Sequence, residues 1–438
     1  MNASYPRFLK YTIANITGML GISCYILADT FFIANGIGPN GLAALNLAIP
    51  IYSFVHGCGL MLGTGGATKY LIAKCQYEHN RANTIFTNSI KIGFLFSIVF
   101  LCIGLCFSQQ LTLLLNADAE LFDMTNIYIK VILLFSPFFI TNEQLLAYVR
   151  NDGAPTLSMI AMVSGSIANI ILDYIFIYPM QMGIFGAVLA TGIAPIVSIL
   201  ILSYHLLGKA CGFHMNMAPI TKEITIDTLI LGFPTLVTEV SAGLIMILFN
   251  ILIMNRAGNM GVAAYGIIAN IALVTTAIFT GFTQGVQPLI SEAHSIESHS
   301  ALKNYTHWTI GGGAALSIIL YACMYFFANP ITALFNSSCD AVLQNLGKTG
   351  LKLYFTALPF TAMNMIIAGS FTATEKPLPA HVITLLRGMI LIFPLSLIMA
   401  QQYGLNGIWL TVTATEALTL VIASYLWNKY SITQKSSL

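Results

Sequence analysis

Long apolar runs, separated by short polar or glycine-rich stretches, dominate the pattern of this 438-residue chain. An apolar run of about 20 residues is long enough to cross a bilayer as a helix. The pattern predicts twelve such helices, at 11–36, 43–73, 84–108, 124–149, 156–179, 184–207, 224–254, 262–290, 304–327, 342–371, 379–400 and 405–428. Several of these runs exceed the spanning length, so we expect those helices to tilt or to protrude from the membrane.

Composition supports the same interpretation. The chain is 57% hydrophobic and only 8% charged, whereas soluble domains carry about 25% charged residues. Only helices and closed barrels satisfy their backbone in lipid, and runs of this length exclude a barrel. The sequence therefore predicts an all-α membrane protein with many spans.

Basic residues indicate the orientation. With the N-terminus inside, fourteen lysines and arginines fall on the cytoplasmic side and four on the other. Cytoplasmic loops are the ones enriched in basic residues. We therefore expect a multi-pass protein of the cell's inner (plasma) membrane with both termini cytoplasmic.

The two halves of the chain are repeated. GPNGLAAL at 38–45 matches GNMGVAAY at 258–265, an offset of 220, and GIFGAVL at 183–189 matches GLNGIWL at 404–410, an offset of 221. The polar stretch that begins at Gly208 lies midway and is interpreted as a linker. These features predict an N-terminal lobe (1–207), a cytoplasmic linker (208–223) and a C-terminal lobe (224–438), related as parallel repeats.

An ionisable residue within an apolar span is costly in lipid, and it marks a candidate functional site. Asn169 and Asp173 lie four residues apart in the fifth span, so they share one helix face. By depth, Asp29 of the first span and Thr191 of the sixth can meet them in the outer half of the membrane. Tyr25, one turn before Asp29, can join the group. The alternative is that Asn169 simply neutralises a structural Asp173 as helix-packing glue.

The chemistry of this group suits a small cation. Two carboxylates that share a site cannot both ionise cheaply, so the pair can carry a proton. Amide and hydroxyl oxygens beside them also suit Na⁺. The sequence leaves H⁺ and Na⁺ both open, and we expect no other cofactor and no bound metal.

Other polar residues within spans are weaker candidates. Glu239 and Glu416 lie mid-membrane in the seventh and twelfth spans, and Gln284 and Gln287 lie near the inner end of the eighth. Glu239, Gln284 and Gln287 are candidate substrate-cavity residues. The alternatives are a buried acid bonded to a polar neighbour for each glutamate, and helix-packing glue for the glutamines.

Several stretches together resemble the multidrug and toxic compound extrusion (MATE) family of cation-coupled exporters, over nearly the whole chain. They are ADTFFIANGIGPNGLAALNLAIP, RNDGAP, ANIILDYIFIYPMQMGIFGAVLAT, GFTQGVQPLIS and GLNGIWL. The resemblance implies two pseudo-symmetric six-helix lobes that form a V-shaped cavity, and alternating access driven by H⁺ or Na⁺. It also implies a cation site at Asp29, Asn169, Asp173 and Thr191, with Tyr25 matching as well. In this chain Ala14 replaces the proline that many members have early in the first span, so any bend there would have to use Gly18 or Gly21.

The leading hypothesis is a cation-coupled antiporter that exports amphipathic, often cationic, drugs or metabolites. A flippase for a lipid-linked precursor is the alternative, although its pyrophosphate head group would need a basic cavity and the charges within the spans are mostly acidic. A membrane receptor or scaffold is a third hypothesis, which the paired acids disfavour. No catalytic motif is present, so we do not expect an enzyme. The expected partners are small organic cations and the lipid bilayer, with no nucleic acid, and we expect a monomer.

Overall fold

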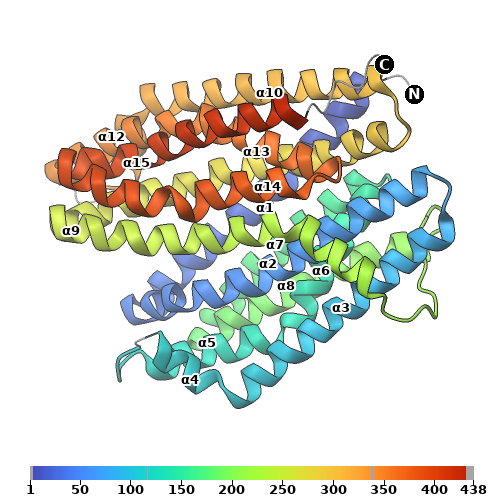
Figure 1. Ribbon diagram of the computed structural model, residues 1–438. Helices are drawn as coiled ribbons and strands as arrows, with labels where there is room; N and C mark the ends of the chain where they lie inside the picture. Colours follow the sequence, from blue (N-terminus) through green and yellow to red (C-terminus); the bar gives the residue numbers. More distant parts are fainter. Residues whose placement is uncertain (1–2, 116, 337–339, 431–438) are drawn as a thin grey trace. The chain divides into compact units, whose positions relative to one another are not determined.

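The computed structural model describes residues 3–115, 117–336 and 340–430, and within these ranges the chain is helical with no strand (Figure 1). The helices divide into two compact units. One unit comprises Tyr5–Val240, and the other begins at Ser241. The lobe boundaries expected from the sequence, at 208–223, remain a prediction.

The unit Tyr5–Val240 contains eight helices and the first part of a ninth. They are α1 (Tyr5–Gly36), α2 (Pro39–Cys75), α3 (His79–Cys106), α4 (Ser108–Leu114), α5 (Phe122–Leu134), α6 (Ser136–Asn151), α7 (Pro155–Ile177), α8 (Gly183–Leu207) and the start of α9 (Lys222–Ser295). Within this unit α1 packs on α7, α7 on α8, and α2 on α6. The first two pairs hold the candidate cation residues together, because these residues lie on α1, α7 and α8.

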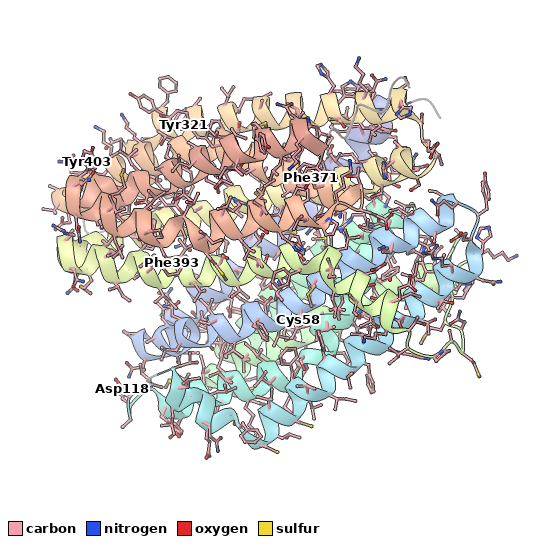
Figure 2. The ribbon with its side chains drawn as sticks, viewed as in Figure 1. Cys58, Asp118, Tyr321, Phe371, Phe393 and Tyr403 are labelled. Carbon is pink, nitrogen blue, oxygen red and sulfur yellow. The ribbon has the colours of Figure 1, made fainter. Side chains whose placement is uncertain are left out.

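The second unit contains the rest of α9 and the helices that follow it. They are α10 (His299–Phe326), α11 (Ala328–Phe335), α12 (Ala341–Tyr354), η1 (Phe355–Ala357), α13 (Leu358–Ala373), α14 (Pro377–Leu385), η2 (Leu386–Ile390) and α15 (Ile392–Tyr430). Phe371 is fully buried and meets Trp427 at 5.8 Å between ring centroids, whereas Tyr403 is 63% exposed (Figure 2).

Helix length and hydropathy support the multi-span prediction. Among the described residues, nine helices are long and apolar enough to cross a membrane, or ten if the bent pair α5–α6 forms one span. Two of the long helical stretches are broken by non-helical backbone, at Gly258 in α9 and Gly404 in α15. The number of spans is therefore compatible with the predicted twelve.

The repeated motifs coincide with turns between helices. Gly258 and Gly404 have φ angles of 58° and 60°, in the left-handed region that glycine adopts without a Cβ penalty. The matching glycines in the N-terminal half of the chain, Gly38 and Gly183, also have positive φ. Each repeat motif therefore begins with a glycine at which the chain changes direction.

One of the prolines within the predicted spans coincides with a sharp bend. The predicted span 124–149 consists of α5 and α6, which meet at 50°. Pro137 lies in the first turn of α6, where its missing N–H leaves no helical hydrogen bond unmade. The bend sets the direction of α6, which carries Glu143 toward α2.

The linker after α8 is held along α3 by polar contacts. Backbone N–H groups of His214, Asn216 and Thr221 donate to side-chain oxygens of Asn83, Thr87 and Asn88 at 2.8–2.9 Å. These asparagine and threonine positions recur on one face of α3 at helical spacing. The segment read from the sequence as a linker is thus fixed by hydrogen bonds.

Asp152, in the turn between α6 and α7, anchors the start of that linker. Its side chain is fully buried. One carboxylate oxygen pairs with Lys74 and accepts from the Tyr70 hydroxyl at 2.5 Å. The other lies 2.7 Å from His205 Nε2 and accepts from the Gly212 N–H at 2.7 Å. Burial by itself raises the pKa of Asp152, but these four partners outweigh it and the pKa is lowered.

We predict that Asp152→Asn destabilises the folded protein at pH 7 by about 1–3 kcal/mol, because it weakens the pairing of buried groups. A carboxylate whose pKa is lowered by folding stabilises the fold above its unfolded pKa of about 3.9, and the contribution is lost as pH falls through the folded value. The unfolding temperatures of variant and wild type, measured in detergent, should therefore converge as the pH falls below about 4. Asp123→Asn, at an exposed position, is the control. A difference that stays constant with pH would contradict this account.

A buried ion pair connects η2 and α15 in the second unit. Arg387 Nε and Nη2 donate to Glu416 Oε1 at 3.0 and 2.6 Å, and Asn364 Nδ2 donates to Glu416 Oε2 at 2.7 Å. Glu416 is 5% exposed. The acid in the twelfth span therefore has a basic partner and an amide partner in the fold.

We predict that Glu416→Leu destabilises the protein by about 3–5 kcal/mol, because it leaves the Arg387 charge buried and unpaired. The double variant Arg387→Met with Glu416→Leu should lose much less, since no uncompensated charge remains. Unfolding temperatures in detergent measure both. Equal losses in the single and double variants would show that the pair is not the source of the effect.

Candidate functional site: a carboxyl pair beside a cavity

The predicted pair on α7 lies inside the unit Tyr5–Val240. Asn169 and Asp173 are both fully buried. With the Asn169 amide oriented by its neighbours, its Nδ2 donates to Asp173 Oδ2 at 3.0 Å, and its Oδ1 accepts from the Thr191 N–H at 3.2 Å. The spacing of four residues thus places the amide against the carboxyl group, and α8 supplies a backbone donor to the amide.

Helix α1 brings a second carboxyl group to the first. Asp29 and Asp173 lie within electrostatic range of each other, and Asp29 is 6% exposed. The Oδ1 atoms of both residues are buried without a hydrogen-bond partner among the described residues. A buried carboxylate oxygen that lacks a donor is costly unless a proton or cation meets it. Two such oxygens from neighbouring residues have the chemistry that suits one positive charge.

Two further helices complete the surroundings. Thr191 on α8 is 6% exposed, and its hydroxyl donates to the Ala187 carbonyl at 3.2 Å. Tyr128 on α5 lies beside Thr191 and interacts electrostatically with both Asp29 and Asp173. Sequence reasoning missed Tyr128, because a tyrosine in an apolar span has no signal that separates it from a core residue.

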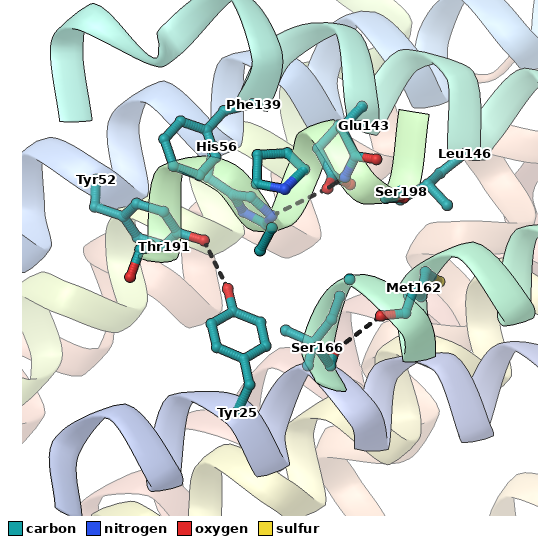
Figure 3. A pocket seen from close by; sticks show the side chains of 15 residues that line it. Tyr25, Tyr52, His56, Phe139, Glu143, Leu146, Met162, Ser166, Thr191 and Ser198 are labelled. Carbon is teal, nitrogen blue, oxygen red and sulfur yellow. Dashed lines mark hydrogen bonds and ion pairs between the residues drawn. The ribbon is translucent and has the colours of Figure 1, made fainter. Parts of the chain in front are cut away.

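Tyr25 connects the carboxyl pair to a cavity of about 40 Å³. Its hydroxyl lies 3.2 Å from the Tyr52 hydroxyl of α2 (Figure 3). Tyr25 and Thr191 line the cavity near the carboxyl pair, and His56 and Glu143 line it as well. All five residues predicted for the cation site therefore belong to one unit, grouped around the carboxyl pair and this cavity.

A histidine on α2 lies between two glutamates, an arrangement that the sequence did not suggest. His56 Nε2 is 3.5 Å from Glu143 Oε1, and His56 Nδ1 is 3.7 Å from Glu239 Oε2. The three residues come from α2, α6 and α9. A histidine within the apolar run at 43–73 was the available signal, but a single histidine does not identify partners on other helices.

The candidate substrate-cavity residues do not share one unit. Glu239 lies in the unit Tyr5–Val240, where it faces His56 with a side chain that is 32% exposed. Gln284 and Gln287 lie in the other unit, and Gln287 is 6% exposed. Their assignment to a substrate cavity stays a prediction.

The carboxyl pair can bind and release one small cation. Buried neighbouring carboxyl groups titrate as a unit, because ionising both at once is costly. Oxygen atoms of Asp29, Asp173 and Thr191 also match the preference of hard cations. Because α1 and α7 pack along each other and each carries one acid, charge at this site changes the interaction between two helices.

Comparisons with known proteins agree with this architecture. The family model described as MatE matches residues 15–175 and 234–398. A multidrug export protein, MepA, from Staphylococcus saprophyticus is 26% identical over 442 residues, covering 99% of this chain and 96% of the relative.

Two solved structures have the same fold. One is a MOP superfamily transporter from Pyrococcus furiosus, described as having a binding pocket of reverse polarity, with a TM-score of 0.90, 22% identity, and coverage of 98% of this chain and 95% of the other. The other is an outward-facing multidrug resistance MATE family transporter, with a TM-score of 0.89, 22% identity and coverage of 98% and 95%. Since the MatE model matches more than half of the chain, the protein belongs to the MatE family of efflux transporters.

Proposed function

We propose that this protein is a cation-coupled antiporter that exports amphipathic, often cationic, drugs or metabolites by alternating access. The buried carboxyl pair Asp29–Asp173 carries the proposal, since two neighbouring acids with unpartnered oxygens suit a transported cation. The full-length similarity to a protein named as a multidrug exporter supports the substrate class. The excess of basic residues on one side supports a plasma-membrane protein with both termini cytoplasmic, and we propose that it acts as a monomer.

We further propose that the coupling ion is H⁺. In the orientation of the Asn169 amide that satisfies its protein neighbours, its N–H faces Asp173 and its oxygen faces the Thr191 N–H. A Na⁺ site would need that oxygen turned toward the ion. Two buried neighbouring carboxyl groups cannot both ionise cheaply, which also favours a proton on one of them.

Proton binding at this site has a direct mechanical consequence. A proton neutralises one of two like charges that are shared between α1 and α7, and its release restores repulsion between these helices. The α1 helix is continuous from Tyr5 to Gly36, and Gly18 packs against Met162 of α7. The proline of α1, Pro6, lies in its first turn, so we propose that the signal passes along the α1–α7 contact without a proline bend inside α1.

The flippase hypothesis is not favoured. A pyrophosphate head group needs basic side chains in the cavity that receives it. The cavity near the carboxyl pair is lined by Glu143, with His56 as its basic residue. The curated relative is named as an exporter of drugs.

We predict that Asp173→Asn lowers ethidium efflux driven by a pH gradient in proteoliposomes by about 5- to 150-fold. This factor corresponds to the coupling free energy that is usual between two sites, about 1–3 kcal/mol. The amide keeps the size and hydrogen bonding of the side chain but cannot exchange the transported proton. An imposed Na⁺ gradient without a pH gradient should not drive export. The readout is the initial rate of efflux at equal protein incorporation.

Asp123→Asn makes the same chemical change at an exposed position on α5 and should transport like the wild type. Unchanged export by the Asp173 variant would refute a coupling role for the carboxyl pair. Export driven by the Na⁺ gradient alone would refute the choice of H⁺ and leave the antiport proposal standing.

A further inference from the structure

His56 lies in a part of α2 against which two glutamate-bearing helices pack closely. A Cβ at Gly57 would lie 3.3 Å from the Cβ of Glu239 on α9, and a Cβ at Gly59 would lie 3.1 Å from the Cβ of Glu143 on α6. Glycine on either side of the helix therefore permits both close approaches. The packing places one carboxylate at each ring nitrogen of His56.

This arrangement determines which form of the ring fits. A neutral imidazole has one N–H donor and one acceptor nitrogen, so it can satisfy only one of two carboxylates. A carboxylate facing the acceptor nitrogen would be repelled by its lone pair. Both contacts, at 3.5 and 3.7 Å, are attractive when both ring nitrogens carry protons. The ring then bears a positive charge between Glu143 and Glu239.

Aromatic groups complete the surroundings of this charge. The Tyr52 ring stacks on the His56 ring with centroids 5.6 Å apart and planes at 17°. Phe139 packs edge-on against Tyr52 at 5.5 Å, and Tyr25 lines the same cavity (Figure 3). Carboxylates together with aromatic faces are the set of groups that recognises organic ammonium ions. The His56 ring occupies the position that such an ion would take.

The size of the cavity shows what binding would require. Its volume of about 40 Å³ is well below that of a cavity that admits benzene, about 150 Å³. An organic cation cannot enter while the ring stays in place. Glu239 is 32% exposed and offers the accessible edge of the site, whereas Glu143 is 10% exposed.

We propose that His56 is a tethered competitor for organic cations of the ammonium class, which bind between Glu143 and Glu239 by displacing the protonated ring. In this exchange one N–H bond of the imidazolium breaks, the proton passes to water, and the ring leaves as neutral imidazole. The ligand replaces the lost positive charge, so the charge between the glutamates is conserved. This inference takes the class of substrate, organic cations, from the proposed function. It adds the site where they bind and the group that competes with them.

Other charged and titratable groups face this region. They are Tyr52 on α2, Tyr25 on α1, and Arg150 on α6, whose guanidinium interacts electrostatically with Glu143. Arg150 also donates to Asn15 at 3.1 Å, which holds it away from the exchange. The two tyrosines are neutral donors, so the charge that a ligand can replace is that of His56.

The test measures binding of benzyltrimethylammonium, a permanent cation, to the purified full-length protein by titration calorimetry without any ion gradient. In the wild type, binding should release about one proton, which appears as a dependence of the measured heat on the ionisation enthalpy of the buffer. Affinity should rise by about tenfold per pH unit while the ring is protonated in the free protein. His56→Gln should bind on the order of tenfold more tightly at neutral pH and release no proton, since the competing charge is gone.

Further variants separate competition from a structural role. His56→Arg keeps a cation that cannot leave as a proton, so it should bind the probe more weakly than the wild type. Glu239→Gln should also bind more weakly, because it removes one of the two carboxylates. His214→Gln, at an exposed position in the linker, is the matched control and should match the wild type in affinity and proton release. If His56→Gln does not fold, the two variants that should weaken binding, His56→Arg and Glu239→Gln, still test whether His56 competes with the probe.

Weaker or unchanged binding by folded His56→Gln, or proton release that persists in it, would overturn the proposal. So would tighter binding by His56→Arg. The two proposals fail separately, because this test uses no gradient. Proton-linked binding without proton-driven export would leave the His56 site standing and refute the antiporter, and the reverse result would refute the His56 site alone.

Discussion

The cost of placing charge inside an apolar helical protein governs the unit Tyr5–Val240. An ionisable group in its interior needs a partner, and the charged partners in this unit come from other helices. Asp29 and Asp173 meet between α1 and α7, and His56 meets glutamates of α6 and α9. Charge pairing therefore determines which helices must stay together, and a change of protonation alters the contacts between them.

The carboxyl pair and the His56 group differ in what they can exchange. At the carboxyl pair, acids with unpartnered oxygens lie deep in the protein beside Asn169, an environment suited to a proton or small cation. Around His56, carboxylates and the stacked Tyr52 ring surround a charge at a partly exposed edge, an environment suited to a larger organic cation. Tyr25 and Thr191 line the cavity that His56 also lines. Residues of the proposed ion site and of the proposed substrate site thus line the same cavity.

Two other buried acids, Asp152 and Glu416, have partners for both carboxylate oxygens. Asp152 uses both carboxylate oxygens to hold Lys74, Tyr70, His205 and the linker backbone. Glu416 likewise divides its oxygens between Arg387 and Asn364. The contrast with the unpartnered oxygens of Asp29 separates structural acids from the candidate functional pair.

The sequence by itself determined the helical membrane class, the repeat and the five residues of the candidate cation site. Long apolar runs, glycine-led repeat motifs and the four-residue spacing of Asn169 and Asp173 are local signals, and helix geometry alone turns them into predictions. Only the tertiary structure decided which groups from distant helices meet. It placed Tyr128 beside Thr191, Arg387 beside Glu416, and His56 between Glu143 and Glu239. The His56 arrangement depends on the bend at Pro137 and on close packing at Gly57 and Gly59, which no sequence period encodes.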